Sequence, residues 1–386
     1  MKKRILSLLL CACLLASALG VTALAAESDV LPARPTEPTL YLGGEALIPT
    51  AEGTTHTFEN GGVATLTTVG KNEAGGTDFA LTLENVRTFK TVRMAIRDRI
   101  CSGGLFFTSG GTGGLQENKD TLSITLKGEN FIYVQVQADE AVATALVTSC
   151  TTSISGDGSL FLMAAPAEGA ETVCYGINVI GGLQVGALLN CMTAKGTALT
   201  LSGELTLTDG ATLRLPDELT LSELESAPAG VGKQVLMNGE TAADTLVIAA
   251  PATPVTRGVA VYNLWKLTGS PAPEGEYPFS DEPMNAFLKD AIHWAGTTGL
   301  AKGCGDGKFH DMDSITNEQF AVLFYRMIGS PAVEGDFPAD YPYADSVSPW
   351  ARDAMLRAST AWPVDPQGIL THAEMDRLVA LLGRRG

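Results

Sequence analysis

The sequence predicts β and α structure in separate domains, with a β-solenoid-like domain followed by a helical module. Three observations support this. A basic, apolar leader opens the chain, short alternating strands broken by glycine follow, and helical spacing replaces the alternation near Pro251. We expect a signal peptide at 1–26, a linker at 27–39, the β domain at 40–250 and the helical module at 251–386.

The leader has the parts of a secretory signal peptide. Lys2, Lys3 and Arg4 are followed by an apolar run from Ile5 to about Leu24, and small residues end the run near Ala25. A lasting membrane anchor is the alternative, but an anchor usually has polar residues on both flanks. No later stretch reaches the roughly 18 apolar residues that a membrane span needs. We therefore expect export, with no membrane contact after cleavage.

Composition limits the classes of partner. The formal charge is −17, and losing a basic leader makes the mature chain more acidic still, so nucleic acid is excluded as an expected partner. With 45% hydrophobic residues and 42 glycines, the chain can bury a core while turning often. The five cysteines outside the leader are too scattered for a disulfide framework, and we expect buried, unreactive thiols at Cys101, Cys150, Cys174, Cys191 and Cys304.

The β domain repeats a strand, a glycine-bearing corner and a second strand. The pattern is clearest in the runs Thr152–Leu162, Tyr175–Val185 and Ala198–Leu215. It favours a right-handed β-helix-like solenoid, because each coil can bury its inward residues against the next while glycine permits tight corners. A β-sandwich with Greek-key connections is the alternative. Residues 75–215 resemble the solenoid-like "carbohydrate-binding domain" regions of exported clostridial-type proteins, which implies a carbohydrate ligand.

The helical module contains three threonines that each begin an amphipathic segment: Thr256, Thr316 and Thr371. A threonine hydroxyl can accept a backbone N–H left unpaired in the first helical turn, and Gln319 and Glu374 would complete capping boxes. The first two segments end alike, in Gly269–Ala272 and Gly329–Ala332, where glycine followed by proline stops a helix. Thr256 and Thr316 lie 60 residues apart, as do the two exits, which indicates an internal repeat.

Further motifs recur between these starts, in the order Pro278–Asp281, Ala291–Ala295, Gly299–Phe309, Pro342–Asp345 and Trp350–Ala354. The full set, over about residues 252–383, resembles the S-layer homology (SLH) family. The resemblance implies an all-α, pseudo-threefold bundle that binds secondary cell-wall polysaccharide, including pyruvylated sugars, in grooves between repeats. It implies neither catalysis nor a cofactor. The first repeat is truncated, because its opening helix is missing.

The resemblance also implies site residues. Arg257 matches the arginine of the family's Thr-Arg pair, whereas Asn317 and His372 take that place in the other repeats. An anionic sugar suits a guanidinium together with backbone N–H groups at a helix N-terminus, and sugar faces suit aromatic rings. The polysaccharide-binding residues expected are therefore Arg257, Trp294, Gly305, Asp306, Gly307, Asn317, Trp350 and His372. The alternatives are a solvated Arg257, tryptophans in the core and a simple tight turn at Asp306.

No pattern in the sequence predicts an active site or a metal centre. Asp306, Asp311 and Asp313 lack the glutamate of an EF-hand loop, and His56 is the single histidine before the helical module. A local basic patch indicates a solvated face or an acidic-glycan contact, and consists of Arg87, Lys90, Arg93, Arg97 and Arg99. No catalytic residue is therefore predicted.

These observations predict a non-enzymatic surface protein, exported by a Gram-positive-type bacterium and attached non-covalently to wall polysaccharide by SLH repeats. Its β domain would display or bind carbohydrate. One alternative is a wall-tethered polysaccharide lyase or hydrolase of the β-helix type. A second alternative is that the degenerate repeats are purely structural.

Overall fold

A computed structural model describes residues 37–96, 99–109, 119–135, 142–166, 172–193, 196–215, 219–223, 233–237, 241–242, 244–283 and 288–383. The predicted signal peptide, linker residues 27–36 and Arg97 lie outside this part of the chain, as do the side chains of Arg99 and Cys101. The chain divides into two compact units, the first reaching Thr253 and the second beginning at Pro254.

The first unit is built of β-strands. They are β1 (Thr39–Leu42), β2 (Glu45–Leu47), β3 (Thr54–Thr57), β4 (Val63–Lys71), β5 (Thr77–Glu84), β6 (Arg87–Thr88), β7 (Val92–Ile96), β8 (Arg99–Thr108), β9 (Thr121–Lys127), β10 (Glu129–Gln135), β11 (Val142–Thr148), β12 (Thr151–Gly156), β13 (Ser159–Ala165), β14 (Val173–Val179), β15 (Leu183–Val185), β16 (Leu188–Thr193), β17 (Gly196–Leu201), β18 (Leu205–Leu207), β19 (Thr212–Leu215), β20 (Leu219–Glu223), β21 (Lys233–Met237), β22 (Thr241–Ala242) and β23 (Thr245–Ala249).

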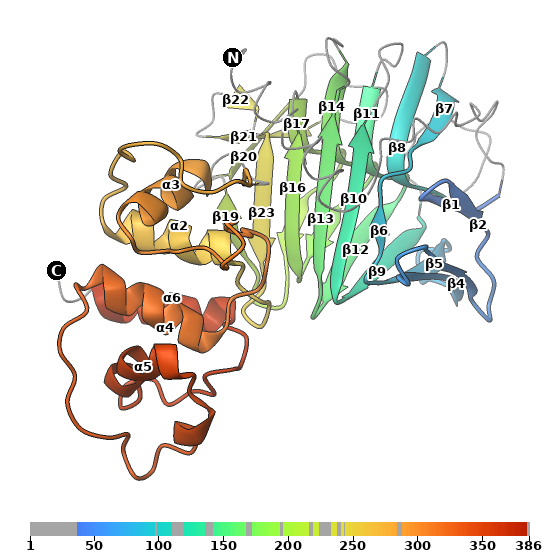
Figure 1. Ribbon diagram of the computed structural model, residues 1–386. Coiled ribbons are helices and arrows are strands. Elements are labelled where there is room, and N and C mark those ends of the chain that lie inside the picture. Colours follow the sequence, from blue (N-terminus) through green and yellow to red (C-terminus); the bar gives the residue numbers. More distant parts are fainter. Residues whose placement is uncertain are drawn as a thin grey trace. The chain divides into compact units, whose positions relative to one another are not determined.

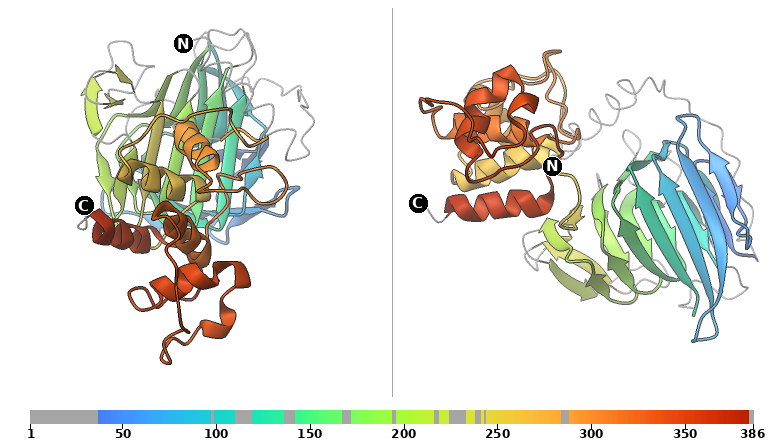
Figure 2. Two further views of the ribbon diagram at one scale, coloured as in Figure 1. Left: turned by 60° about the vertical axis from the view of Figure 1, so that its left-hand side comes forward. Right: turned by 90° about the horizontal axis from the view of Figure 1, so that it is seen from below.

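These strands form three sheets (Figures 1 and 2). Sheet A has the order β2-β1-β8-β11-β14-β17-β21-β20, with β7 on β8 and β22 on β21; sheet B has β18-β15-β12-β9-β5-β4-β3; sheet C has β19-β23-β16-β13-β10-β6. In the middle of the unit the chain visits sheets B, C and A in rotation. Each strand there pairs in parallel with the strand three places later, as β9 does with β12 and β10 with β13.

The predicted right-handed β-helix-like solenoid is wrong. The sheets are mixed and do not close into a solenoid, because antiparallel pairs such as β4–β5 and β7–β8 lie on one side of the parallel strands and β16–β23 and β17–β21 on the other. The strands in the middle of the unit pair in parallel, so the unit also differs from the antiparallel Greek-key sandwich that was the alternative. Period-2 alternation gives the inward face of a strand but is the same for parallel and antiparallel neighbours, which explains the error.

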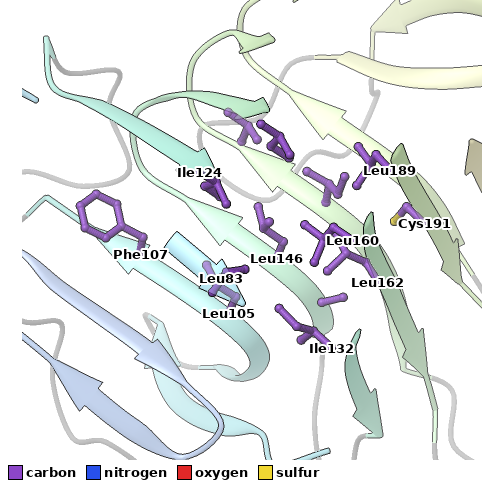
Figure 3. Close-up of a cluster of buried hydrophobic side chains, with 14 of the residues drawn as sticks. Leu83, Leu105, Phe107, Ile124, Ile132, Leu146, Leu160, Leu162, Leu189 and Cys191 are labelled. Atoms are coloured by element: carbon purple, nitrogen blue, oxygen red, sulfur yellow. The ribbon is translucent and has the colours of Figure 1, made fainter. Parts of the chain in front are cut away.

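Alternate residues of all three sheets point into one hydrophobic core (Figure 3). Ile124 of sheet B, Leu146 of sheet A and Leu160 of sheet C are each 0% exposed. Neighbouring strands keep these positions in register, as in the pair Ile124↔Ile154. Cys150, Cys174 and Cys191 are buried free thiols, as expected, whereas Cys304 of the second unit is exposed.

Gly176, on β14, leaves no room for a side chain in this core. A Cβ atom at this position would lie 1.9 Å from Sγ of Cys191 and 2.5 Å from the carbonyl oxygen of Ala198. Contacts this short do not occur between real atoms, so the close approach of β14 to β16 and β17 requires glycine.

The second unit contains short helices joined by long irregular segments. They are α2 (Arg257–Leu267), α3 (Lys289–Thr297), α4 (Asn317–Met327), α5 (Arg352–Ala358) and α6 (His372–Gly383), with 3₁₀ turns η2 (Ala344–Ser346) and η3 (Pro349–Ala351). The predicted all-α bundle is therefore wrong, since residues 268–283 and 328–343 contain neither helix nor strand. Prolines supply the reason, because they lack the N–H that a helix needs, and they stand at Pro271, Pro273, Pro278, Pro283, Pro331, Pro338 and Pro342.

No helix in the described part of the chain is long and apolar enough to cross a membrane.

Candidate functional site

The three predicted helix starts meet at a ring of backbone hydrogen bonds in the second unit. The N–H of Val255 donates to the carbonyl of Leu370 (2.9 Å), that of Leu370 to Ile315 (2.9 Å), and that of Ile315 to Val255 (3.0 Å). Each residue directly precedes one of the threonines, and each is 0% exposed. The ring therefore holds the starts of α2, α4 and α6 together.

The threonines cap their helices as the sequence predicted. Thr256 accepts the backbone N–H three residues on. Thr316 and Gln319 form a capping box, and so do Thr371 and Glu374, whose carboxylate accepts the N–H of Thr371 at 3.1 Å. Local side-chain chemistry thus fixes all three starts.

The first N–H groups of α2 and α4 are already occupied. Arg257 and Gly258 donate to the carbonyls of Asp313 (2.8 Å) and Asp311 (2.9 Å), in the segment that precedes α4. Likewise, Asn317 and Glu318 of α4 donate to the segment that precedes α6. These four N–H groups are therefore paired within the second unit.

Arg257 is the predicted site residue with the clearest binding geometry. Its Nε donates to the carbonyl oxygen of Phe309 at 3.0 Å, and its guanidinium carbon lies 5.1 Å from the centroid of the Phe309 ring. Within the described residues, neither Nη atom has a hydrogen-bond or ion-pair partner. Arg257 is half-buried and is held through its Nε, so the N–H groups on its two Nη atoms stay available for an anion.

Gly305, Asp306 and Gly307 belong to an exposed loop that Asp306 organises. Its Oδ1 accepts the N–H of Lys308 (3.0 Å), and its Oδ2 lies 2.7 Å from Nε2 of His310. The hydrogen bond from His310, followed by that from Lys308, lowers the pKa of Asp306. These two bonds close a tight turn at Asp306.

Asp281 fixes the end of the same loop. Its Oδ1 accepts the N–H of Phe309 (2.7 Å) and its Oδ2 that of His310 (2.9 Å). Because Phe309 supports Arg257, Asp281 indirectly positions the guanidinium. The sequence marked Asp281 as part of a repeated motif, but its partners on the loop are 28 and 29 residues away and only the fold shows them.

Asn317 and His372, the counterparts of Arg257, lie inside the unit. Asn317 is 4% exposed and donates through Nδ2 to the carbonyl of Asp365 at 2.9 Å; His372 is 1% exposed. The structure therefore places neither side chain where it can contact a polymer. Both positions serve the packing of the repeats.

The two predicted tryptophans differ in exposure. Trp294 is half-buried and packs against the core of the second unit, whereas Trp350, on η3, is 58% exposed.

The start of η3 is held by Glu318, a buried carboxylate (2% exposed) that accepts the N–H of Ser348 at 2.9 Å and its hydroxyl at 2.8 Å. Sequence reasoning missed Glu318, because Gly258 and Ala373 occupy its place in the other repeats.

The metal and basic-patch hypotheses concern other groups of residues. The described residues contain no group of three or more His, Cys, Asp or Glu side chains that could hold a metal ion. In the basic patch, Arg87 pairs with Glu129 (3.0 Å) and Lys90 with Glu59 (3.4 Å), so acidic neighbours offset part of its charge.

No known protein-family profile matches the chain. A stretch of 91 residues is 28% identical to the outer membrane protein SlpA of Thermus thermophilus. The match covers 24% of this chain and 10% of that protein, so the similarity is limited to a small part of the relative.

Proposed function

We propose that this is an exported cell-surface protein whose second unit attaches it non-covalently to an anionic polysaccharide of a Gram-positive-type wall. The observation that carries the proposal is Arg257, a guanidinium supported by Phe309 with both Nη atoms open among the described residues. Planar N–H pairs of this kind suit a carboxylate, such as that of a pyruvylated sugar. The similarity to an outer membrane protein supports a place at the cell surface.

The proposed site is weaker than three intact repeats would be. Arg257 has no cationic counterpart on the surface, because Asn317 and His372 are buried. Trp350, with 58% of its surface exposed, adds a second contact of the kind that sugar rings prefer. The first unit displays or binds carbohydrate in this proposal, and no catalytic step is part of it.

Cosedimentation of the mature chain, residues 27–386, with purified cell walls tests the proposal. Replacing Arg257 with glutamine removes a charge-assisted pair worth about 1.5–3 kcal/mol, so we expect the affinity to fall roughly tenfold or more. Arg377→Gln is the matched control, because Arg377 is an exposed arginine of α6 that carries no role in the site. Equal binding by both variants would contradict attachment through Arg257 and favour purely structural repeats.

A further inference from the structure

A row of aromatic rings leads away from the Arg257 guanidinium within the second unit. The centroid of the Phe309 ring lies 5.1 Å from the guanidinium carbon and 5.3 Å from the centroid of the Phe279 ring. The Phe279 ring lies in turn 5.9 Å from that of Tyr277. Aromatic rings at these distances are in contact, so an unbroken row joins Arg257 to Tyr277. The polysaccharide-binding residues expected from the sequence included neither Phe279 nor Tyr277.

The outer part of this row is accessible to a ligand. Phe309 is 1% exposed and supports its neighbours from inside, whereas Phe279 and Tyr277 are half-buried. Phe279 and His293 hold the Tyr277 ring in one orientation, because they pack against it at interplanar angles of 78° and 74°. A ring that is already held in place and still partly exposed loses little entropy when a ligand binds to it.

The equivalent tyrosine of the next repeat is buried. Tyr341 directly precedes the motif Pro342–Asp345, as Tyr277 directly precedes Pro278–Asp281. Tyr341 is 6% exposed, and its hydroxyl donates to a backbone carbonyl at 3.0 Å. That carbonyl belongs to the residue before the one whose carbonyl accepts the side chain of Asn317. The tyrosine is thus accessible on the side of the arginine and buried on the side of Asn317.

The charges around Tyr277 indicate what kind of sugar the ring suits. Nζ of Lys289 lies 5.6 Å from the centroid of the Tyr277 ring, but it is paired with a carboxylate oxygen of Glu282 at 2.6 Å. This ion pair leaves no net charge beside the ring, and the preceding residue in the chain is the exposed Glu276. A second carboxylate therefore gains no attraction here, whereas the apolar face of a neutral sugar can stack on the ring.

We infer that Tyr277 is a specificity-determining residue of the Arg257 site, on which a neutral sugar stacks close to the anionic sugar that Arg257 binds. Phe279 positions the Tyr277 ring. The inference rests on the proposed attachment function and adds a second contact, for a second kind of sugar, to the same site. Loss of the ring should weaken binding about two- to tenfold, the range that one aromatic contact typically contributes.

Two substitutions separate the ring from the space that it fills. Tyr277→Leu removes the ring but keeps an apolar side chain, and Tyr277→Phe keeps the ring. Tyr343→Leu is the matched control, because Tyr343 is also half-buried but belongs to the repeat whose tyrosine at 341 is buried.

The first experiment measures the affinity of the mature chain for purified wall polysaccharide at low and at high salt. Tyr277→Leu should lose about two- to tenfold at both salt concentrations. The loss in Arg257→Gln should instead shrink at high salt, because salt screens charges. We expect Tyr277→Phe and Tyr343→Leu to bind like the wild type.

A second experiment uses the wild-type mature chain, and so does not depend on the folding of Tyr277→Leu. In hydroxyl-radical footprinting, added polysaccharide should protect Tyr277 from oxidation and leave the oxidation of Tyr343 unchanged. Unchanged oxidation of Tyr277, or wild-type affinity in folded Tyr277→Leu, would overturn this inference alone if Arg257→Gln still weakened binding. No binding of the polysaccharide by the wild type would overturn the proposed function, and this inference with it.

Discussion

Gly176 offers a quantitative test of how the first unit packs. Alanine there would bring Cβ to 1.9 Å from Sγ of Cys191 and 2.5 Å from the carbonyl oxygen of Ala198, against an optimum of about 3.5–4.0 Å. Neither neighbour can move easily, because Cys191 is 0% exposed and Ala198 belongs to a paired strand. Overpacking costs about 1–3 kcal/mol, and we expect the upper half of that range since one neighbour is backbone.

Urea unfolding of the mature chain measures this cost. Far-UV circular dichroism follows the strands, while tryptophan fluorescence reports only the second unit, which holds all four tryptophans: Trp265, Trp294, Trp350 and Trp362. Gly182→Ala is the matched control, because the nearest neighbours of its added Cβ lie at 3.4 and 3.8 Å. We expect the control to stay within about 0.5 kcal/mol of the wild type. If Gly176→Ala were as stable as Gly182→Ala, the close packing of β14 on β16 and β17 would be refuted.

Three further predictions concern single side chains. In Glu318→Gln, one of the two oxygens that accept the N–H and the hydroxyl of Ser348 becomes an NH₂ group, which can only donate. The second unit should lose about 1–3 kcal/mol of stability in thermal unfolding. An unchanged unfolding midpoint would refute the buried network. Native maleimide labelling followed by peptide mapping should modify Cys304 but not Cys150, whose pKa burial raises to about 12; equal labelling would contradict the core. Hydrogen bonds, first from a threonine and then from an asparagine, lower the pKa of Asp78 below 3.8. Its stabilising effect is therefore present above that value and is lost as the pH falls through the lowered pKa. Asp78→Asn should reduce the loss of stability in acid, and an unchanged dependence of stability on pH would argue against these bonds.

The features that the sequence predicted correctly depend on short-range chemistry. A threonine followed three residues later by glutamine or glutamate determines a helix start without help from distant residues, and Thr316 and Thr371 behave accordingly. Alternation likewise gave the inward face of strands such as β9, where Leu122 and Ile124 are 0% exposed. Both patterns are complete within a few residues.

The features that it missed depend on partners far along the chain. Whether β16 accepts a parallel or an antiparallel neighbour depends on strands more than 20 residues away, so alternation predicted a solenoid where the sheets are mixed. Asn317 and His372 occupy the place of Arg257 in their repeats, but only tertiary packing shows that they are buried. The support of Arg257 by Phe309, and of Phe309 by Asp281, was hidden for the same reason.

The most direct test of wall attachment compares cell walls before and after chemical removal of their polysaccharide. The mature chain should sediment with intact walls and stay in the supernatant with the stripped peptidoglycan. Equal sedimentation with both preparations would contradict polysaccharide as the partner.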